Sequence, residues 1–197
     1  MMVKICGITC VEDARVAVEA GASAIGFNFY SGSSRCVSPA QASTMAATLP
    51  AGVLKVGVFV NESPATVAEI ARAVALDVVQ LHGGEAPAGW RFWRACRVDG
   101  EKVLNLETAQ GADAILLDAA VPGLHGGTGQ SFAWHLAQLP GRRVIVAGGL
   151  DASNVREAIR AAHPWGVDAC SRIESTAGKK DHGKMTDFIK AALAETP

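Results

Sequence analysis

Short apolar segments rich in β-branched residues recur along this chain and alternate with longer segments of helical character. Most are apolar almost throughout, which is typical of strands buried on both faces of a sheet. Strands covered by helices on both faces form parallel sheets with crossover connections. Eight segments are expected strands: Val3–Ile8, Ala24–Tyr30, Leu54–Val60, Val78–His82, Phe92–Val98, Asp113–Asp118, Arg143–Ala147 and Val167–Ser171.

Eight strands, each followed by a helical or turn segment, predict an α/β fold of the closed (β/α)₈-barrel type, the TIM barrel. The length of 197 residues suits one domain and lies at the low end for this fold. We therefore expect a single trimmed barrel over residues 1–197. The expected strand starts have nearly the same spacing in the two halves of the chain, as a half-barrel duplication would produce.

Capping residues precede several of the expected helices. Ser38 and Ser63 each stand directly before a proline, which is the usual order of N-cap and first helical residue. Thr9 is followed three residues later by a glutamate, which predicts a capping box for the first helix. Asp151 or Ser153 is expected to cap the helix through residues 156–162.

Two connecting segments are poor helix formers. Glu85–Arg91 contains a proline and a glycine and has room for about one helical turn, so the fourth helix is expected to be degenerate. Gly100–Gln110 is also unfavourable for a helix. The last helix is expected over Met185–Ala194.

The charge balance argues against nucleic-acid and membrane partners. Charged residues make up 19% of the chain and the formal net charge is -1, so no overall field attracts a polyanion. No apolar stretch approaches the roughly 20 residues that span a bilayer, and the first residues do not resemble a signal peptide. We expect a soluble cytoplasmic protein.

The cysteines are few, odd in number and widely spaced, with no C-x-x-C pair. This argues against a disulfide framework and against a structural zinc site, and no metal ligand set is expected. Reduced thiols of this kind are usually small buried apolar residues. That interpretation is adopted for all except Cys6, namely for Cys10, Cys36, Cys96 and Cys170.

Two titratable residues stand at the carboxyl ends of expected strands, where barrels of this type place their active sites. Cys6 lies near the carboxyl end of the first strand and Asp118 ends the sixth, so they could face one substrate as base and acid. Burial would raise the carboxyl pKa as an acid requires. Lys4 lies two residues before Cys6 on the same side of the strand and is a candidate for lowering the thiol pKa.

Glycine-rich turns follow the sixth and seventh strands, and these are candidates for a phosphate site. Backbone N–H groups of the loops after strands seven and eight commonly meet a phosphate in barrels of this type. Gly127, Gly149 and Ser171 are the residues assigned to it. Gln80, His82 and Asp168 lie within strands or at their ends, where roles in the barrel interior and in substrate contact both remain open.

Seven motifs follow one another along nearly the whole chain: Lys4–Thr9, Gly26–Tyr30 with Ser34–Pro39, Val56–Asn61, Val79–Gly83, Leu116–Asp118, Gly126–Gly129 and Ala147–Leu150. Their order and spacing resemble those of the phosphoribosylanthranilate isomerase family. The resemblance implies a cofactor-free Amadori rearrangement in tryptophan biosynthesis, acting on a small phosphosugar. Both monomers and homodimers are plausible for such a barrel.

The resemblance also implies roles for individual residues. Asp118 would protonate the furanose ring oxygen and open the ring to a Schiff base. Cys6 would remove the C2' proton, and the resulting enolamine would tautomerise to the ketone. Arg35 would hold the anthranilate carboxylate, which suits a planar guanidinium. Gln80, His82 and Asp168 are further candidates for substrate contact.

The chain departs from the family pattern at two places. Strand eight of the family usually ends in Ser-Ser-Gly-Val-Glu, whereas here residues 170–174 read Cys-Ser-Arg-Ile-Glu. Arg172 in place of glycine either costs backbone freedom or brings a guanidinium to the phosphate. Gln130 stands where the family commonly has a lysine after the glycine loop.

Two other functions compete with this one. A related barrel isomerase of histidine biosynthesis performs the same rearrangement on another aminoribotide, with an aspartate as base on strand one and two phosphate sites. The thiol at position 6 and the single evident phosphate site favour the anthranilate substrate. A non-catalytic barrel that only binds a phosphosugar is the alternative from a different class.

Overall fold

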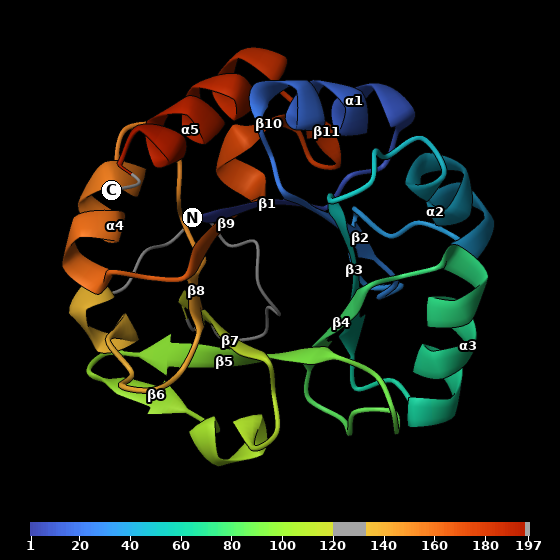
Figure 1. Cartoon of the computed structure of the whole chain (residues 1–197), viewed down its shortest axis with the longest axis horizontal. Coiled ribbons are helices and arrows are strands. Elements are labelled where there is room, and N and C mark those ends of the chain that lie inside the picture. The colour runs from blue at the N-terminus through green and yellow to red at the C-terminus, as the bar shows by residue number, and fades with distance from the viewer. Residues whose placement is uncertain (120–132, 196–197) are drawn as a thin grey trace.

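Eight parallel strands close into a barrel in this structure, a computed structural model that describes residues 1–119 and 133–195. Figure 1 shows the strands around a central axis with the α-helices outside them. Each barrel strand has two parallel neighbours, because β4 pairs with β5 and β1 pairs with β9. In ring order the strands are β1 (Met2–Cys6), β2 (Ala24–Asn28), β3 (Leu54–Val60), β4 (Val78–His82), β5 (Phe92–Asp99), β7 (Ala114–Ala119), β8 (Val144–Val146) and β9 (Gly166–Ala169).

The predicted barrel is confirmed, and each of its strands begins within one residue of the predicted start. Several strands end earlier than predicted. The last one stops at Ala169 and not at Ser171, because residues 171–173 form a 3₁₀ turn. This turn, η3 (Ser171–Ile173), changes the direction of the chain at the rim of the barrel.

Five α-helices are present in the described part of the chain. They are α1 (Val11–Ala20), α2 (Pro39–Ala46), α3 (Pro64–Val74), α4 (Val155–Ala162) and α5 (His182–Ala194). Residues 83–91 contain no helix, so the fourth helix is degenerate, as expected over Glu85–Arg91. After β5 the chain instead forms β6 (Lys102–Leu104), antiparallel to β5, and the 3₁₀ helix η1 (Leu106–Ala109). A further 3₁₀ helix, η2 (Trp134–Ala137), precedes β8.

The helix caps agree with the sequence at two positions and differ at others. Ser38 forms a complete capping box for α2, and Ser63 accepts a hydrogen bond from the backbone of Thr66 in α3. The capping box expected at Thr9 is wrong, because this hydroxyl donates to the carbonyl of Gly178 at 2.6 Å. The side chain that Thr9 would have used for its own helix is thus committed to a segment distant in sequence.

The fourth and fifth α-helices also begin differently from the prediction. The N-cap of α4 is Asn154 and makes no side-chain cap bond, so neither Asp151 nor Ser153 caps this helix. The last helix, α5, starts three residues before the predicted Met185, because Asp181 accepts a hydrogen bond from the Lys184 backbone.

The interior of the barrel is apolar at the amino ends of its strands. A cluster of buried residues from seven barrel strands fills this end, and Trp93 is its largest member, fully buried. Trp93 packs edge-to-face against Trp165 with ring centroids 5.9 Å apart. Packing therefore accounts for Trp93. The apolar layer closes this end and leaves polar residues to the opposite end.

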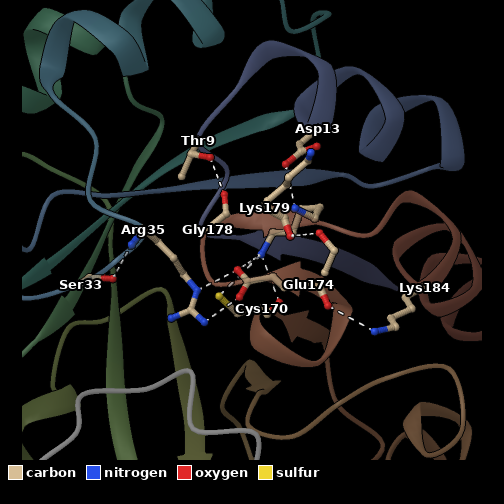
Figure 2. A network of polar contacts seen from close by, with 11 residues as sticks. Thr9, Asp13, Ser33, Arg35, Cys170, Glu174, Gly178, Lys179 and Lys184 are labelled. Carbon is tan, nitrogen blue, oxygen red and sulfur yellow. Dashed lines mark hydrogen bonds and ion pairs between the residues drawn. The ribbon is translucent and has the colours of Figure 1, made fainter.

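A short hairpin covers the rim between β9 and α5. Its strands are β10 (Glu174–Thr176) and β11 (Lys179–Lys180), paired antiparallel. Lys180 donates from Nζ to Glu174 Oε1 at 2.9 Å, and Glu174 accepts from Arg35 Nε and Nη2, each at 2.8 Å. The backbone N–H of Lys180 donates to Asp13 of α1. Figure 2 shows how this network joins the hairpin to the loop after β2.

Glu174→Gln is expected to lower the free energy of unfolding by about 3–5 kcal/mol, the usual cost of removing one partner from a buried ion pair. The side chains of Lys180 and Glu174 are 0% and 4% exposed, so two cations would be left without their shared carboxylate. Urea unfolding followed by circular dichroism measures the change. Glu12→Gln is the control, because Glu12 pairs with Arg15 on the surface and should matter little. Equal stability of Glu174→Gln and the parent would contradict the interpretation.

Candidate functional site

One cavity lies at the carboxyl ends of the barrel strands, the end at which barrels of this type carry their chemistry. Nearly all of the residues predicted for the site line it, whichever strand they come from. These are Cys6, Arg35, Gln80, His82, Asp118, Gly149, Asp168, Ser171 and Arg172. Gly127 and Gln130 lie outside the described residues.

Cys6 and Asp118 reach the cavity from different sides of the ring. Cys6 ends β1 and Asp118 lies near the end of β7, with β9 and β8 between these two strands. The two residues are 8% and 6% exposed, so each is largely withdrawn from water but borders the cavity. A thiol and a carboxyl group thus border one cavity, as the sequence predicted.

A buried ion pair lies beneath the cavity. Lys4 Nζ donates to Asp168 Oδ1 at 2.9 Å, and the Lys4 side chain is fully buried. Burial raises the pKa of Asp168 to about 7, although Lys4 opposes the shift. Burial alone would lower the pKa of Lys4, but Asp168 and Cys6 outweigh it and raise that pKa. Lys4 is therefore a permanent cation inside the barrel.

The thiol of Cys6 has a lowered pKa, and its neighbours explain the direction. A hydrogen bond from Cys170 is the largest cause, and it outweighs burial, which acts in the opposite sense. The positive charges of Lys4 and Lys180 lower the pKa further, and Lys4 also hydrogen-bonds Cys6. The cation expected beside Cys6 is therefore present, because residues two apart on a strand face the same side.

Cys170 does not fit the interpretation of an inert buried thiol. It is partly exposed and lines the cavity, and Lys180 Nζ lies 3.8 Å from its sulfur. The hydrogen bond to Cys6 and burial together raise the pKa of Cys170. Cys10 and Cys36 are exposed, so that interpretation is also wrong for them. Cys96 is buried as expected, and burial raises its pKa to about 11.

Gln80 and His82 occupy neighbouring inward positions on β4. Gln80 Nε2 lies 3.0 Å from His82 Nε2, and because an amide nitrogen can only donate, it donates to the imidazole. Gln80 is only 2% exposed, and within the described residues its Oε1 accepts no hydrogen bond. A buried amide oxygen of this kind normally has a donor. Because Gln80 borders the cavity, a bound molecule can supply one.

The cavity wall next to β8 and β9 consists of backbone and a cation. Gly148 and Gly149 follow β8 with φ values of 79° and 63°, a region that favours glycine. Arg172 Nε forms an ion pair with Asp151 Oδ2 at 2.7 Å. Arg172 is not among the described non-glycine residues with positive φ, so position 172 does not require a glycine for its backbone conformation. The sequence had left that question open.

Arg35 reaches the cavity from the loop after β2 and is fixed there by Glu174. Its stem crosses the end of β1 at Gly7, where φ is 70°. A Cβ added at Gly7 would lie 2.6 Å from Arg35 Cδ, so this approach needs a glycine. Nη1 of Arg35 donates no hydrogen bond to a described residue. The orientation of the guanidinium is fixed by Glu174, which accepts from Nε and Nη2.

Sequence reasoning missed Glu174 and Lys180 as parts of the site. Glu174 ends the five-residue segment that was compared with the family pattern, so its position was the available signal. Lys180 lies in a loop-like stretch with no motif around it, and only the folded hairpin brings its ammonium group to Glu174 and Cys170.

Among the described residues, no three His, Cys, Asp or Glu side chains come together as metal ligands would. No described helix has the length and apolar character needed to cross a bilayer.

Comparisons with known proteins point to one family. The sequence pattern of N-(5'-phosphoribosyl)anthranilate (PRA) isomerase matches residues 3–191. The N-(5'-phosphoribosyl)anthranilate isomerase of Solibacter usitatus (strain Ellin6076) is 54% identical over 198 residues, which cover 98% of each chain.

Solved structures agree with the sequence comparison. The phosphoribosyl anthranilate isomerase of Thermotoga maritima superimposes with a TM-score of 0.87 and 40% identity, covering 98% of this chain and 99% of that one. A phosphoribosyl anthranilate isomerase in complex with reduced 1-(o-carboxyphenylamino)-1-deoxyribulose 5-phosphate has a TM-score of 0.83 and 39% identity, with coverage of 98% and 99%. The chain described here therefore belongs to the N-(5'-phosphoribosyl)anthranilate isomerase family.

Proposed function

We propose that this chain isomerises N-(5'-phosphoribosyl)anthranilate to 1-(2-carboxyphenylamino)-1-deoxyribulose 5-phosphate, with Asp118 as general acid and Cys6 as general base. The observation that carries the assignment is that both side chains border one cavity from separate strands. Acid–base chemistry on one substrate requires two proton-transfer groups that reach it from different directions. Their separate environments allow one group to give a proton while the other accepts one.

In this mechanism Asp118 gives its proton to the furanose ring oxygen, and the C1'–O bond breaks to leave a Schiff base. Cys6, held as a thiolate by its neighbours, then takes the proton from C2'. The electron pair of that C–H bond moves to form an enolamine, which tautomerises to the ketone. Lys4 and Asp168 do not move protons in this scheme. They form a charged layer beneath Cys6 that favours the thiolate.

Arg35 is the proposed partner of the anthranilate carboxylate. Glu174 occupies Nε and Nη2 of its guanidinium and leaves the two N–H groups on Nη1 for a second carboxylate. A guanidinium held on one edge loses little freedom when it binds on another. Gln80 and His82 are proposed to contact the sugar, and the buried Gln80 Oε1 would then accept from a hydroxyl group.

The phosphate is proposed to bind at the part of the cavity wall formed by Gly149, Ser171 and Arg172. Glycine brings backbone N–H groups within reach of the anion, and an arginine at the rim supplies charge. Arg172 is 42% exposed and already paired with Asp151, so it can turn towards a phosphate without being freed from a buried position. Gly127 remains a sequence-based prediction.

The alternatives make different predictions. A histidine-pathway isomerase would be expected to use a carboxylate base, whereas β1 ends in a thiol.

We propose the cytoplasm as the location, because a thiolate base has to stay reduced. Either a monomer or a homodimer is compatible with this proposal, and one solved relative is described as a monomer of a dimeric enzyme.

The pH dependence of Cys6 alkylation tests the charged layer. Because the pKa of Cys6 is lowered, iodoacetamide should label it with a midpoint below the value of about 8.5 for a free thiol. Lys4→Met removes the positive charge and keeps a side chain of similar volume. Asp168, left without its cation, then takes up a proton. The midpoint should therefore move upwards in this variant.

Mass spectrometry of labelled peptides gives the midpoint for each cysteine separately. Lys190→Met on the exposed side of α5 is the control and should leave the Cys6 profile unchanged. Cys96, whose pKa burial raises to about 11, should stay unlabelled at neutral pH. An identical Cys6 midpoint in the parent and in Lys4→Met would refute the role of Lys4.

Cys6→Ala and Asp118→Asn are each expected to lower kcat by about 10²–10⁴-fold, the usual contribution of a general base or acid. Product affinity should change little, since both groups act mainly on protons. Loss of substrate fluorescence measures turnover, and product titration measures affinity.

Cys10→Ala, at an exposed thiol, and Asp113→Asn, at the opposite end of β7, are the matched controls and should retain parental kcat. If Cys6→Ala and Asp118→Asn both turn over at the parental rate, the acid–base assignment is wrong. Turnover of only the histidine-pathway aminoribotide would favour the first alternative. Binding of the anthranilate substrate without turnover by the parent protein would favour a non-catalytic barrel.

A further inference from the structure

We propose that Cys6 and Cys170 are a site of reversible oxidation, at which a peroxide converts the two thiols to a disulfide and stops the isomerase. The inactivation rests on the proposed function, since it requires Cys6 to be the base. Formation of the bond does not depend on that role. Among the described cysteines, these two are the pair that share a cavity.

The strand pairing places the two thiols side by side. Ile5 of β1 is paired with Ala169 of β9, so the next residues along the chains are Cys6 and Cys170. Neighbouring strands are about 4.8 Å apart. This separation falls within the range of about 4.4–6.8 Å between Cα atoms that disulfides span. Both cysteines border the same cavity, so the two sulfur atoms are directed into one space.

Cations lie beside both sulfur atoms, and the two thiols differ in the direction in which their pKa is shifted. Lys4 lies beneath Cys6, and Lys180 Nζ contacts the Cys170 sulfur at 3.8 Å and its carbonyl oxygen at 3.1 Å. Cations favour a thiolate, which is the form that attacks peroxides. Cys6 has the lowered pKa and Cys170 the raised one, so one sulfur is the nucleophile and the other keeps its proton.

The reaction balances with a peroxide as the only oxidant. The Cys6 thiolate attacks one oxygen of hydrogen peroxide, the O–O bond breaks, and a sulfenic acid and hydroxide result. The sulfur of Cys170 then attacks the sulfenic sulfur, its proton passes to the departing hydroxyl group, and water leaves as the S–S bond forms. Two sulfur atoms together lose two electrons, and the peroxide is reduced. A dithiol such as dithiothreitol reverses the change.

The position of the pair makes this oxidation selective and consequential. Cys170 is partly exposed at the cavity, whereas Cys96 lies in the core with a pKa raised by burial to about 11. In the disulfide, Cys6 has no free thiolate to accept the C2' proton. The buried ion pair below and the hairpin beside it need not move for this to happen, because both sulfurs already face the cavity.

The test treats the full chain with hydrogen peroxide and follows isomerase turnover together with non-reducing peptide mapping. We expect turnover to fall by about 10²-fold or more, the effect of removing a general base. The fall should parallel the appearance of one cross-linked peptide containing Cys6 and Cys170. Dithiothreitol should restore both the activity and the free thiols. A variant with Cys10→Ser and Cys36→Ser, at the exposed thiols, should behave as the parent does.

The Cys170→Ser variant tests whether Cys170 is the thiol that forms a disulfide with oxidised Cys6. The serine hydroxyl can still donate to Cys6 but cannot form a disulfide, so continued oxidation should carry Cys6 to a sulfinic acid. Measured against its own untreated activity, this variant should lose turnover that dithiothreitol does not restore. Full recovery of Cys170→Ser, or inactivation of the parent without the cross-linked peptide, would overturn the proposal.

The two readouts keep this inference apart from the proposed function. If no cross-link forms while Cys6→Ala remains inactive, the oxidation proposal fails and the acid–base assignment stands. If the cross-link forms and turnover persists, the inactivation fails together with the role of Cys6 as base.

Discussion

The parallel pairing of β1 with β9 is the contact on which the site depends. It closes the ring and brings together residues more than 160 positions apart, including Lys4 and Asp168 at 2.9 Å. A slip of one residue would turn a buried charge outward into the apolar layer under the helices. A charge buried there without its partner would strongly destabilise the folded state. The ion pair therefore fixes the register that also aligns Cys6 with Cys170.

Each cation at or beneath the cavity has a carboxylate partner, so these charges do not form a general basic field. Arg35 and Lys180 share Glu174, Lys4 faces Asp168, and Arg172 faces Asp151. The net charge of the chain is only -1, in keeping with this balance. Recognition of a substrate that carries a carboxylate and a phosphate then depends on N–H groups fixed in direction, which discriminate by geometry more than by attraction at a distance.

The strands could be predicted because burial on both faces leaves a continuous apolar signal, and the candidate residues at their ends followed from the fold. Features that depend on distant partners could not. Thr9 has a good capping sequence but is bonded to Gly178, and Glu174 acquires its role only when the hairpin folds over the rim. Cys170 looked inert because no local pattern shows which thiol lies on the neighbouring strand. The segment after β5 had no helical signal, yet its antiparallel strand was not evident from the sequence.

Gly7 links the backbone of the first strand to the selectivity of the mouth. Its φ of 70° and the 2.6 Å approach of Arg35 Cδ to the place of a Cβ are independent reasons for glycine at this position. Position 7 therefore has to stay a glycine for the side chain at position 35 to pass over it. Attempts to redirect this barrel to substrates that lack a carboxylate can vary residue 35 freely only while Gly7 is kept. Diversifying both positions together would mix altered selectivity with a damaged strand end.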